Sequence, residues 1–321
     1  MFSLPLNLTI LSFIFTAYDD IPMKNIMKNS LKQQAQLLLT RDGLFTAAQH
    51  LVPQQKISEV AGRLAASKNP LIKKTFVKTF AKAYGITLEE YARKDLADFK
   101  SFNDFFTREL DVDARPIDNT DQGVISPADG MISQIGHIQQ GQILQAKGRD
   151  YSVSHLLADT ENKDGNYYEG GSFATVYLAP SNYHRVHMPF DGTLIETRYV
   201  PGTLFSVNNV TAQNMPDLFA RNERLVCVFD TEFGKACVVL VGAMIVAGIE
   251  TVATGKIERS EQIQTLEHNI RLKKGDELGR FYLGSTAIVV LPKSAGTEWT
   301  QDMKHGSVVQ MGQLLGVAAK A

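Results

Sequence analysis

Three short stretches of the sequence combine polar side chains with residues that favour tight turns. They are SPADG at 126–130, YHRVHMP at 183–189 and LGST at 283–286. Asp129, His187 and Ser285 supply the groups with which a carboxylate orients an imidazole and the imidazole takes a hydroxyl proton. Each stretch also has an ordinary structural explanation, because Asp-Gly is a common hairpin turn pair and histidines are often structural. Together they indicate nucleophilic chemistry without fixing the reaction.

The histidine spacing also fits half of a metal site, through His184 and His187. Zinc needs three or four ligands, and neither Cys227 nor Cys237 belongs to a CxxC pair, so we expect no metal. Both cysteines stand in apolar runs, which is typical of core thiols in a reducing compartment.

A serine hydrolase with an intact chain is one alternative, and a β-rich binding module without chemistry is another. The hydrolase is disfavoured because the G-x-S-x-G turn is absent: Ser285 stands in L-G-S-T-A. The surrounding sequence also lacks the alternating helices of that fold.

The elements that must position these residues change character along the chain. After Arg115-Pro116 the sequence consists of short alternating or β-branched runs separated by Gly, Asn, Asp and Pro. This pattern predicts a mostly antiparallel sandwich or barrel. The run Ala287 to Leu291 reads as a buried strand that follows directly on Gly284-Ser285-Thr286.

The N-terminal part is basic. Between Met23 and Ile86 eleven Lys or Arg face two acidic residues, whereas the whole chain carries a net charge of −1. Such an asymmetry indicates an anionic partner, either a membrane surface or nucleic acid.

One predicted helix, at 71–84, carries two stripes at i, i+4 spacing. The apolar stripe is Ile72, Phe76, Phe80 and Tyr84, and the basic stripe is Lys74, Lys78 and Lys82. This pattern fits a helix in the membrane interface, with the phenylalanines among the acyl chains and the lysines among anionic headgroups. The alternative is a helix packed on the body with a solvated lysine face. A second helix is expected from Thr87 onward, with Thr87 as N-cap and Glu90 completing a capping box.

These features predict an α+β chain: a helical, basic, membrane-associating region followed by a β-rich, mostly antiparallel catalytic body. The expected boundaries are an apolar extension at 1–22, the helical region at 23–100 and the body at 101–321. The extension has no positive flank and is short for a membrane span, so a membrane anchor and a start at Met23 or Met27 both remain open.

From about residue 100 to about 315 the chain resembles the bacterial phosphatidylserine decarboxylases. The motifs that carry the resemblance are FNDFFTREL, RPID, SPADG, YHRVHMPFDG, PGTLFSVN, RNERLVCVFDTEFG, VGAMIVAGIETV and KKGDELGRFYLGSTAIVVLP. They occur in the order that the family has them, and the last one is the most specific.

The resemblance implies that the chain cuts itself between Gly284 and Ser285 and converts Ser285 into a pyruvoyl cofactor, with no metal. His187 would deprotonate Ser285, with Asp129 holding the imidazole, and His184 would donate a proton during decarboxylation. Tyr177 and Thr286 would contact the substrate.

The resemblance also implies partners and a location. The substrate would be phosphatidylserine in an anionic membrane, and the products phosphatidylethanolamine and CO2. Fragments 1–284 and 285–321 would stay together and form a homodimer of heterodimers, peripheral to the cytoplasmic face of the cell membrane, with no nucleic acid bound.

Overall fold

The computed structural model describes residues 49, 54–146, 148–159, 166–243, 248–282 and 285–319. The predictions for residues 1–22, and for the helical region up to residue 48, fall outside these residues. In the described part, every helix is too short or too polar to span a bilayer.

The N-terminal elements form a small helical group. They are α4 (Gln54–Ala65), α5 (Pro70–Ala83), η1 (Leu96–Asp98) and α6 (Phe102–Phe106). Helix α5 begins where its sequence signals a start, because the Asn69 side chain accepts a hydrogen bond from the Leu71 amide and Pro70 occupies the first turn. The Ser101 side chain caps α6 by accepting from the Asp104 amide.

The prediction of a second helix from Thr87 onward is wrong. Apart from η1, the chain between α5 and α6 is irregular, and it leaves α5 through Gly85 with φ of 61°. Glu90 does not complete a capping box, because its carboxylate pairs with Arg115 at 2.9 Å. A long-range ion pair therefore replaces the local bond that the sequence suggested.

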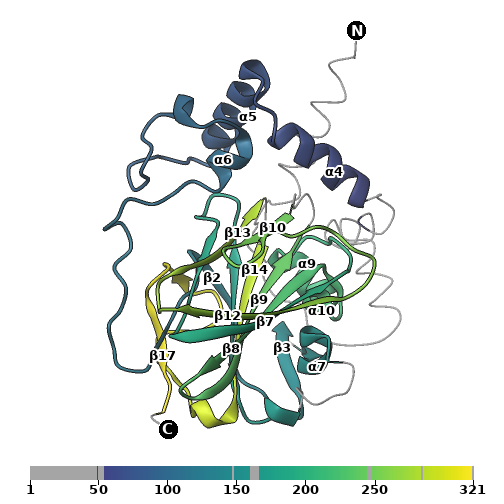
Figure 1. Cartoon of the computed structure of the whole chain (residues 1–321), viewed down its shortest axis with the longest axis vertical. Helices are drawn as coiled ribbons and strands as arrows, with labels where there is room; N and C mark the ends of the chain where they lie inside the picture. The colour runs from purple at the N-terminus through teal and green to yellow at the C-terminus, as the bar shows by residue number, and fades with distance from the viewer. Residues whose placement is uncertain are drawn as a thin grey trace.

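Aromatic rings hold the helical group together. The Phe80 ring lies 5.0 Å from that of Phe102 and 5.8 Å from that of Phe106, both in edge-on geometry. Tyr183, from the body of the protein, belongs to the same buried cluster. The group covers one end of the β structure (Figure 1).

The body is built from antiparallel strands, as predicted. The eight-stranded sheet has the order β12-β7-β8-β9-β14-β5-β2-β16. Its strands are β2 (Gly130–His137), β5 (Ser172–Leu178), β7 (Gly192–Val200), β8 (Arg224–Thr231), β9 (Gly234–Gly242), β12 (Gln264–Leu272), β14 (Ser285–Leu291) and β16 (Val308–Val309).

Three smaller sheets and four short helices complete the described body. The four-stranded sheet has the order β11-β10-β13-β6, with β6 (Arg185–His187), β10 (Gly248–Thr251), β11 (Gly255–Lys256) and β13 (Glu277–Tyr282). The others are β1-β17-β15, with β1 (Gly123–Ile125), β15 (Glu298–Trp299) and β17 (Leu314–Val317), and the hairpin β3 (Gln142–Ala146) with β4 (Arg149–Ser152). The helices are α7 (Val153–Leu157), α9 (Asn209–Asn214), α10 (Leu218–Arg221) and η2 (Lys293–Ala295).

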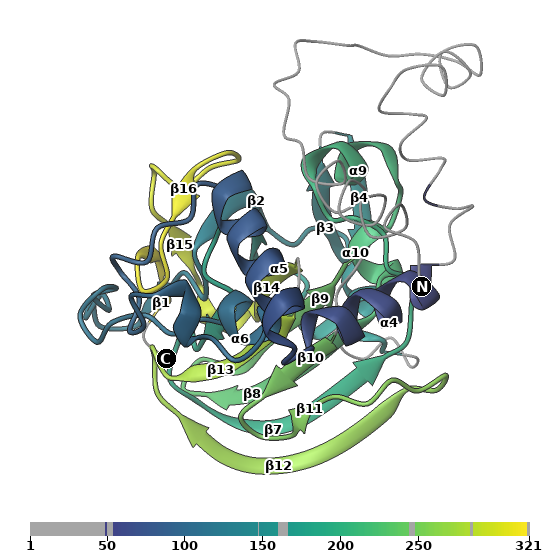
Figure 2. The same cartoon turned by 90° about the horizontal axis from the view of Figure 1, so that it is seen from above.

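Strand β14 lies at the centre of the large sheet and is buried on both faces. Ala287, Val289 and Leu291 face the four-stranded sheet, where they join Phe281 and Leu278 in one apolar cluster. The alternate residues face the cluster that contains α7, α9, α10 and the β3-β4 hairpin. In Figure 2, β10, β11 and β13 of the four-stranded sheet are seen between β2 and β12, the two sides of the curved large sheet. The uninterrupted apolar run of β14 follows from this double burial.

Candidate active site

The aspartate and histidine stretches are bonded to each other, and the strand before the third stretch is bonded to the histidine stretch. The His187 amide donates to the Pro127 carbonyl at 2.8 Å, which joins the histidine stretch to the aspartate stretch. The Phe281 amide donates to the His184 carbonyl at 3.0 Å. The strand that leads toward Ser285 is thus bonded to the histidine stretch.

Ser285 and Thr286 begin β14 and point to opposite faces of the sheet. Ser285 pairs with Leu178 and shares the face of the cluster beneath the four-stranded sheet, whereas Thr286 pairs with Tyr177 and shares the other face. Both hydroxyls are fully buried and have no hydrogen-bond partner among the described residues. Buried hydroxyls normally find a partner, so these two are exceptions within the described residues. Gly284 lies outside the described residues.

The His187 imidazole is held at both ring nitrogens. Nδ1 lies 2.8 Å from the Gly275 carbonyl oxygen and Nε2 lies 2.8 Å from the Tyr183 hydroxyl. Burial lowers the pKa of His187, although the bond to Gly275 and the charge of Glu277 act in the opposite direction. The imidazole is therefore neutral at pH 7. Neither of its nitrogens bonds to the Ser285 Oγ, which has no partner among the described residues.

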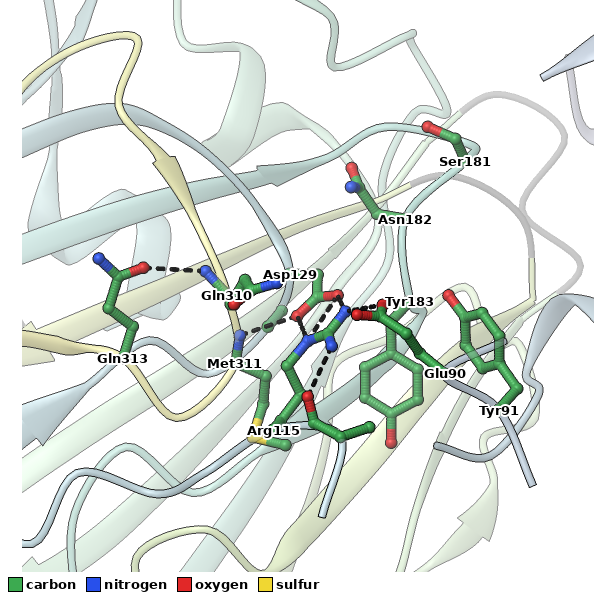
Figure 3. A network of polar contacts seen from close by, with 12 residues as sticks. Glu90, Tyr91, Arg115, Asp129, Ser181, Asn182, Tyr183, Gln310, Met311 and Gln313 are labelled. Atoms are coloured by element: carbon green, nitrogen blue, oxygen red, sulfur yellow. Dashed lines mark hydrogen bonds and ion pairs between the residues drawn. The ribbon is translucent and has the colours of Figure 1, made fainter. Parts of the chain in front are cut away.

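Asp129 is held by Arg115, and the predicted bond between Asp129 and His187 is not among the hydrogen bonds of the described residues. Arg115 donates from Nη2 at 2.7 Å and from Nε at 3.0 Å to the carboxylate, which also accepts from the Met311 amide at 2.8 Å (Figure 3). A guanidinium presents two parallel donors to a carboxylate, so it fixes Asp129 more firmly than one imidazole would. The negative charge of Asp129 nevertheless acts to raise the pKa of His187.

His184 is fully buried, and neither ring nitrogen has a hydrogen-bond partner in the described part of the chain. Its ring packs edge-on against Phe106, with 4.0 Å between the centroids. Burial lowers its pKa well below the usual value, and the charge of Arg108 adds to the effect. The His184 imidazole is therefore neutral in this state of the protein.

Arg108 fixes the turn before His184. Its Nη2 donates to the Ser181 carbonyl at 2.8 Å, to the Asn182 carbonyl at 3.2 Å and to the Tyr91 hydroxyl at 3.0 Å. The guanidinium also lies 4.4 Å above the Tyr91 ring. The helical group thus determines where the histidine stretch lies.

Comparison with known proteins gives the same assignment along the chain. The family model described as phosphatidylserine decarboxylase matches residues 102–317, and a second model, PSD, matches residues 44–85. The chain is 70% identical over 275 residues to the phosphatidylserine decarboxylase proenzyme of Psychrobacter arcticus, covering 86% of this chain and 99% of the relative. The chain belongs to the phosphatidylserine decarboxylase family.

Two further relatives carry the same name. The proenzyme of Psychrobacter cryohalolentis is 69% identical over 86% of this chain and 99% of its own length. The proenzyme of Acinetobacter baumannii is 55% identical over 85% of this chain and 95% of its own length. The 102–317 match contains all three stretches of the site, and the 44–85 match contains α4 and α5.

Helix α5 differs from the predicted membrane helix in its apolar face. Lys74, Lys78 and Lys82 are exposed, as a lipid-facing basic stripe requires. Phe80 is only 4% exposed, and Phe76 packs against Phe102 with 6.0 Å between the ring centroids. The prediction that these phenylalanines enter the membrane is therefore wrong in this structure, because they bury the contact with α6.

The sequence analysis missed Tyr183 and Arg115 as parts of the site. Both stand in motifs that carried the resemblance, YHRVHMP and RPID, but their types gave no sign of the partners they have. Within the described residues no group of three or more His, Cys, Asp or Glu is placed to hold a metal ion.

Proposed function

We propose that this chain decarboxylates phosphatidylserine to phosphatidylethanolamine and CO2, using a pyruvoyl group made from its own Ser285. The observation that carries the proposal is the 70% identity to a relative named phosphatidylserine decarboxylase proenzyme, over 99% of that relative. The word proenzyme describes a precursor that is processed. The buried Ser285 hydroxyl, without a partner in the described part of the chain, supports Ser285 as the processed residue.

Self-cleavage begins with transfer of the Ser285 hydroxyl proton to His187. The oxygen attacks the Gly284 carbonyl carbon, the C–N bond breaks, and the released amine takes the proton, leaving an ester. Elimination then releases residue 284 as a carboxylate and leaves dehydroalanine, which one water molecule converts to pyruvoyl and ammonia. Asp129 assists as a nearby negative charge that stabilises the imidazolium, while Arg115 keeps it in place.

The surroundings of residue 285 fit a pyruvoyl group. The precursor hydroxyl is buried, and the neighbouring histidine stretch supplies a proton donor in an apolar setting. When formed, the group supplies a carbonyl that accepts the substrate amine and withdraws electrons as CO2 departs. His184 donates a proton to the substrate's α-carbon, and the substrate's negative charge raises the pKa of His184 from its lowered value. Thr286 and Tyr177, on the opposite face of the sheet, are proposed as weaker contacts with the headgroup.

The helical group brings this site to the lipid. We place the protein peripherally on the cytoplasmic face of the membrane, with residues 23–100 as the membrane-associating region and 101–321 as the catalytic body. Lys74, Lys78 and Lys82 meet the anionic headgroups. Fragments 1–284 and 285–321 remain together and pair as a homodimer.

Intact-mass measurement tests the proposal. Active protein is expected to contain two chains, 1–284 and a pyruvoyl-blocked 285–321, and the Ser285→Ala variant a single inactive chain. Ser307→Ala, at a partly exposed turn serine, is the matched control and should split normally. Active material that consists of one 35.5 kDa chain would overturn the proposal.

A further inference from the structure

Tyr183 makes a contact that the proposed reaction does not yet use. Its side chain is 2% exposed and sits in the aromatic cluster of α5 and α6, while its hydroxyl reaches out of that cluster to His187 Nε2 at 2.8 Å. The two rings lie 5.6 Å apart at 32°. A residue of the helical cluster is thus bonded directly to the proposed base.

The opposite nitrogen of the ring fixes the direction of this bond. A carbonyl oxygen only accepts, so the 2.8 Å contact with Gly275 requires that Nδ1 carries the proton. In the neutral imidazole Nε2 then holds a lone pair, and the Tyr183 O–H must donate to it. The imidazole is fixed as the tautomer in which Nε2 is the basic atom.

Other charged groups surround this pair. Those that act on His187 or Tyr183 are Arg185 on β6, Glu277 on β13, Asp129 in the 126–130 stretch and Glu109 after α6. Arg185 and Glu277 pair with each other at 2.9 Å, and Asp129 pairs with Arg115 at 2.7 Å. These charged side chains therefore bond to one another and not to His187. Tyr183 and Gly275 are the groups that hold the His187 ring.

We infer that the Tyr183 hydroxyl, rather than Asp129, positions the His187 imidazole, together with the Gly275 carbonyl that fixes Nε2 as its basic nitrogen. The consequence for self-cleavage rests on the proposed function, whereas the tautomer does not. The bond also connects the helical group to the base, because the Tyr183 ring is packed by the same cluster that contains Phe80 and Phe106.

A hydrogen bond donated to the neutral form of a base favours that form and lowers its pKa. Removing the hydroxyl with Tyr183→Phe keeps the ring packing but removes this effect, so the pKa of His187 should rise. The Tyr183 bond to Nε2 must yield when this nitrogen takes the Ser285 proton, so its role is to orient the ring beforehand. Self-cleavage should therefore slow about tenfold in Tyr183→Phe, because the ring loses one of its two tethers. The acid limb of its pH profile should move to higher pH, because the imidazole now protonates at a higher pH.

The first test uses nuclear magnetic resonance on the uncleaved Ser285→Ala protein. The 15N shifts of His187 should show a protonated Nδ1 and a bare Nε2, and His187→Asn assigns the signals. The pKa of His187 should rise in Tyr183→Phe but not in Tyr91→Phe, which removes another hydroxyl of the same cluster, one bonded to Arg108.

The outcomes separate the inference from the proposed function. A protonated Nε2, or the same His187 titration with and without the Tyr183 hydroxyl, would overturn the inference. The 15N measurement needs no substitution at position 183, so it decides the question even if Tyr183→Phe folds poorly. If chains with Ser285 do not split, but the expected tautomer and shift are found, the proposed function fails and the positioning role stands.

Discussion

Asp129 keeps its charge inside the protein because Arg115 accompanies it. Their side chains are 8% and 5% exposed, and the Met311 amide adds a further donor. Removing one partner of a buried pair strands the other charge, which typically costs about 3–5 kcal/mol, whereas replacing both by apolar residues costs much less. In the Ser285→Ala background we therefore expect Arg115→Met to lower the free energy of unfolding by about that amount. Arg115→Met/Asp129→Leu should lower it less, as measured by urea unfolding.

Equal losses in the single and double variants would show that the ion pair does not determine the stability of this turn. Arg93→Met/Asp104→Leu and its single variants form a control set, because this pair is more exposed, at 32% and 29%. Its single variants should cost about 1 kcal/mol or less.

His184 should affect turnover and not processing. It lies in the histidine stretch, and its ring packs edge-on against Phe106. It makes no hydrogen bond within the described residues. His184→Ala is expected to split into two chains at a normal rate and then decarboxylate phosphatidylserine about 10²-fold or more slowly, because a general acid is lost. His187→Ala is the matched variant and should fail at splitting itself. Mass measurement and turnover on the same preparation check both, and a fully active His184→Ala would remove this residue from the mechanism.

At the scale of elements, helix α5 has two faces with different tasks. Its phenylalanines hold α6, and its three lysines face outward. Each lysine near an anionic surface contributes on the order of 1 kcal/mol, and salt screens the effect within about 8–10 Å. Lys74/Lys78/Lys82→Glu should therefore self-cleave normally but bind phosphatidylserine vesicles weakly in co-sedimentation. Because the phenylalanine rings of α5 are buried, the vesicle binding of the natural chain depends on charge. Its affinity for the vesicles should therefore fall steeply as the salt concentration rises.

A control for charge alone is Lys235/Lys256/Lys304→Glu, which makes the same change at exposed positions on other elements. It should bind vesicles nearly as well as the natural chain. If both triple variants lose binding equally, net charge and not the α5 face governs attraction to the membrane. If neither does, the lysines form only a solvated face.

The sequence predicted elements better than contacts. Alternating and β-branched runs report burial on one or both faces, so the antiparallel body and strand β14 could be read from them. The stripe of Phe76 and Phe80 was also visible, but periodicity does not say what covers a stripe, and here α6 does. The helix expected from Thr87 failed for a similar reason, because Glu90 pairs with Arg115, 25 residues away.

The site shows the same limit. Residue types suggested which side chains act, and the structure brings their segments together. The partners of His187 and Asp129 come from residues up to 182 positions distant in the chain, namely Gly275, Arg115 and Met311. Such pairs depend on the register of β6 against β13 and on how segment 311–313 meets the 126–130 turn, and a single sequence carries neither.

At the scale of the whole molecule, the proposed cut leaves the small chain locked into the body. Strand β14 lies between β5 and β9 and is fully buried, and the Met311 amide binds Asp129 of the large chain. We expect the two chains to elute together on gel filtration and to separate only in denaturant. Elution of a free 285–321 chain from native protein would contradict this placement of β14.

The stability of the whole chain should depend on pH through the two site histidines. Burial lowers the pKa of both His184 and His187, so the folded protein keeps them neutral where the unfolded chain, with a histidine pKa near 6.5, takes up protons. The unfolded state therefore binds more protons below about pH 6.5, and the free energy of unfolding falls as the pH drops. Each such histidine contributes up to about 1.4 kcal/mol per pH unit until its folded form also protonates. Above pH 7 neither contributes.

Urea unfolding of the Ser285→Ala chain between pH 7.5 and pH 5 measures this slope. The double variant His184→Asn/His187→Asn should have a flatter slope, because up to two fewer protons are taken up on unfolding. His268→Asn, on the outer strand β12, makes the same substitution outside the site and serves as the control. Because His184 is fully buried without a partner in the described part of the chain, while His187 has two, His184→Asn alone should remove the larger share. A slope that persists in the double variant would mean that carboxylates, and not these imidazoles, control acid unfolding.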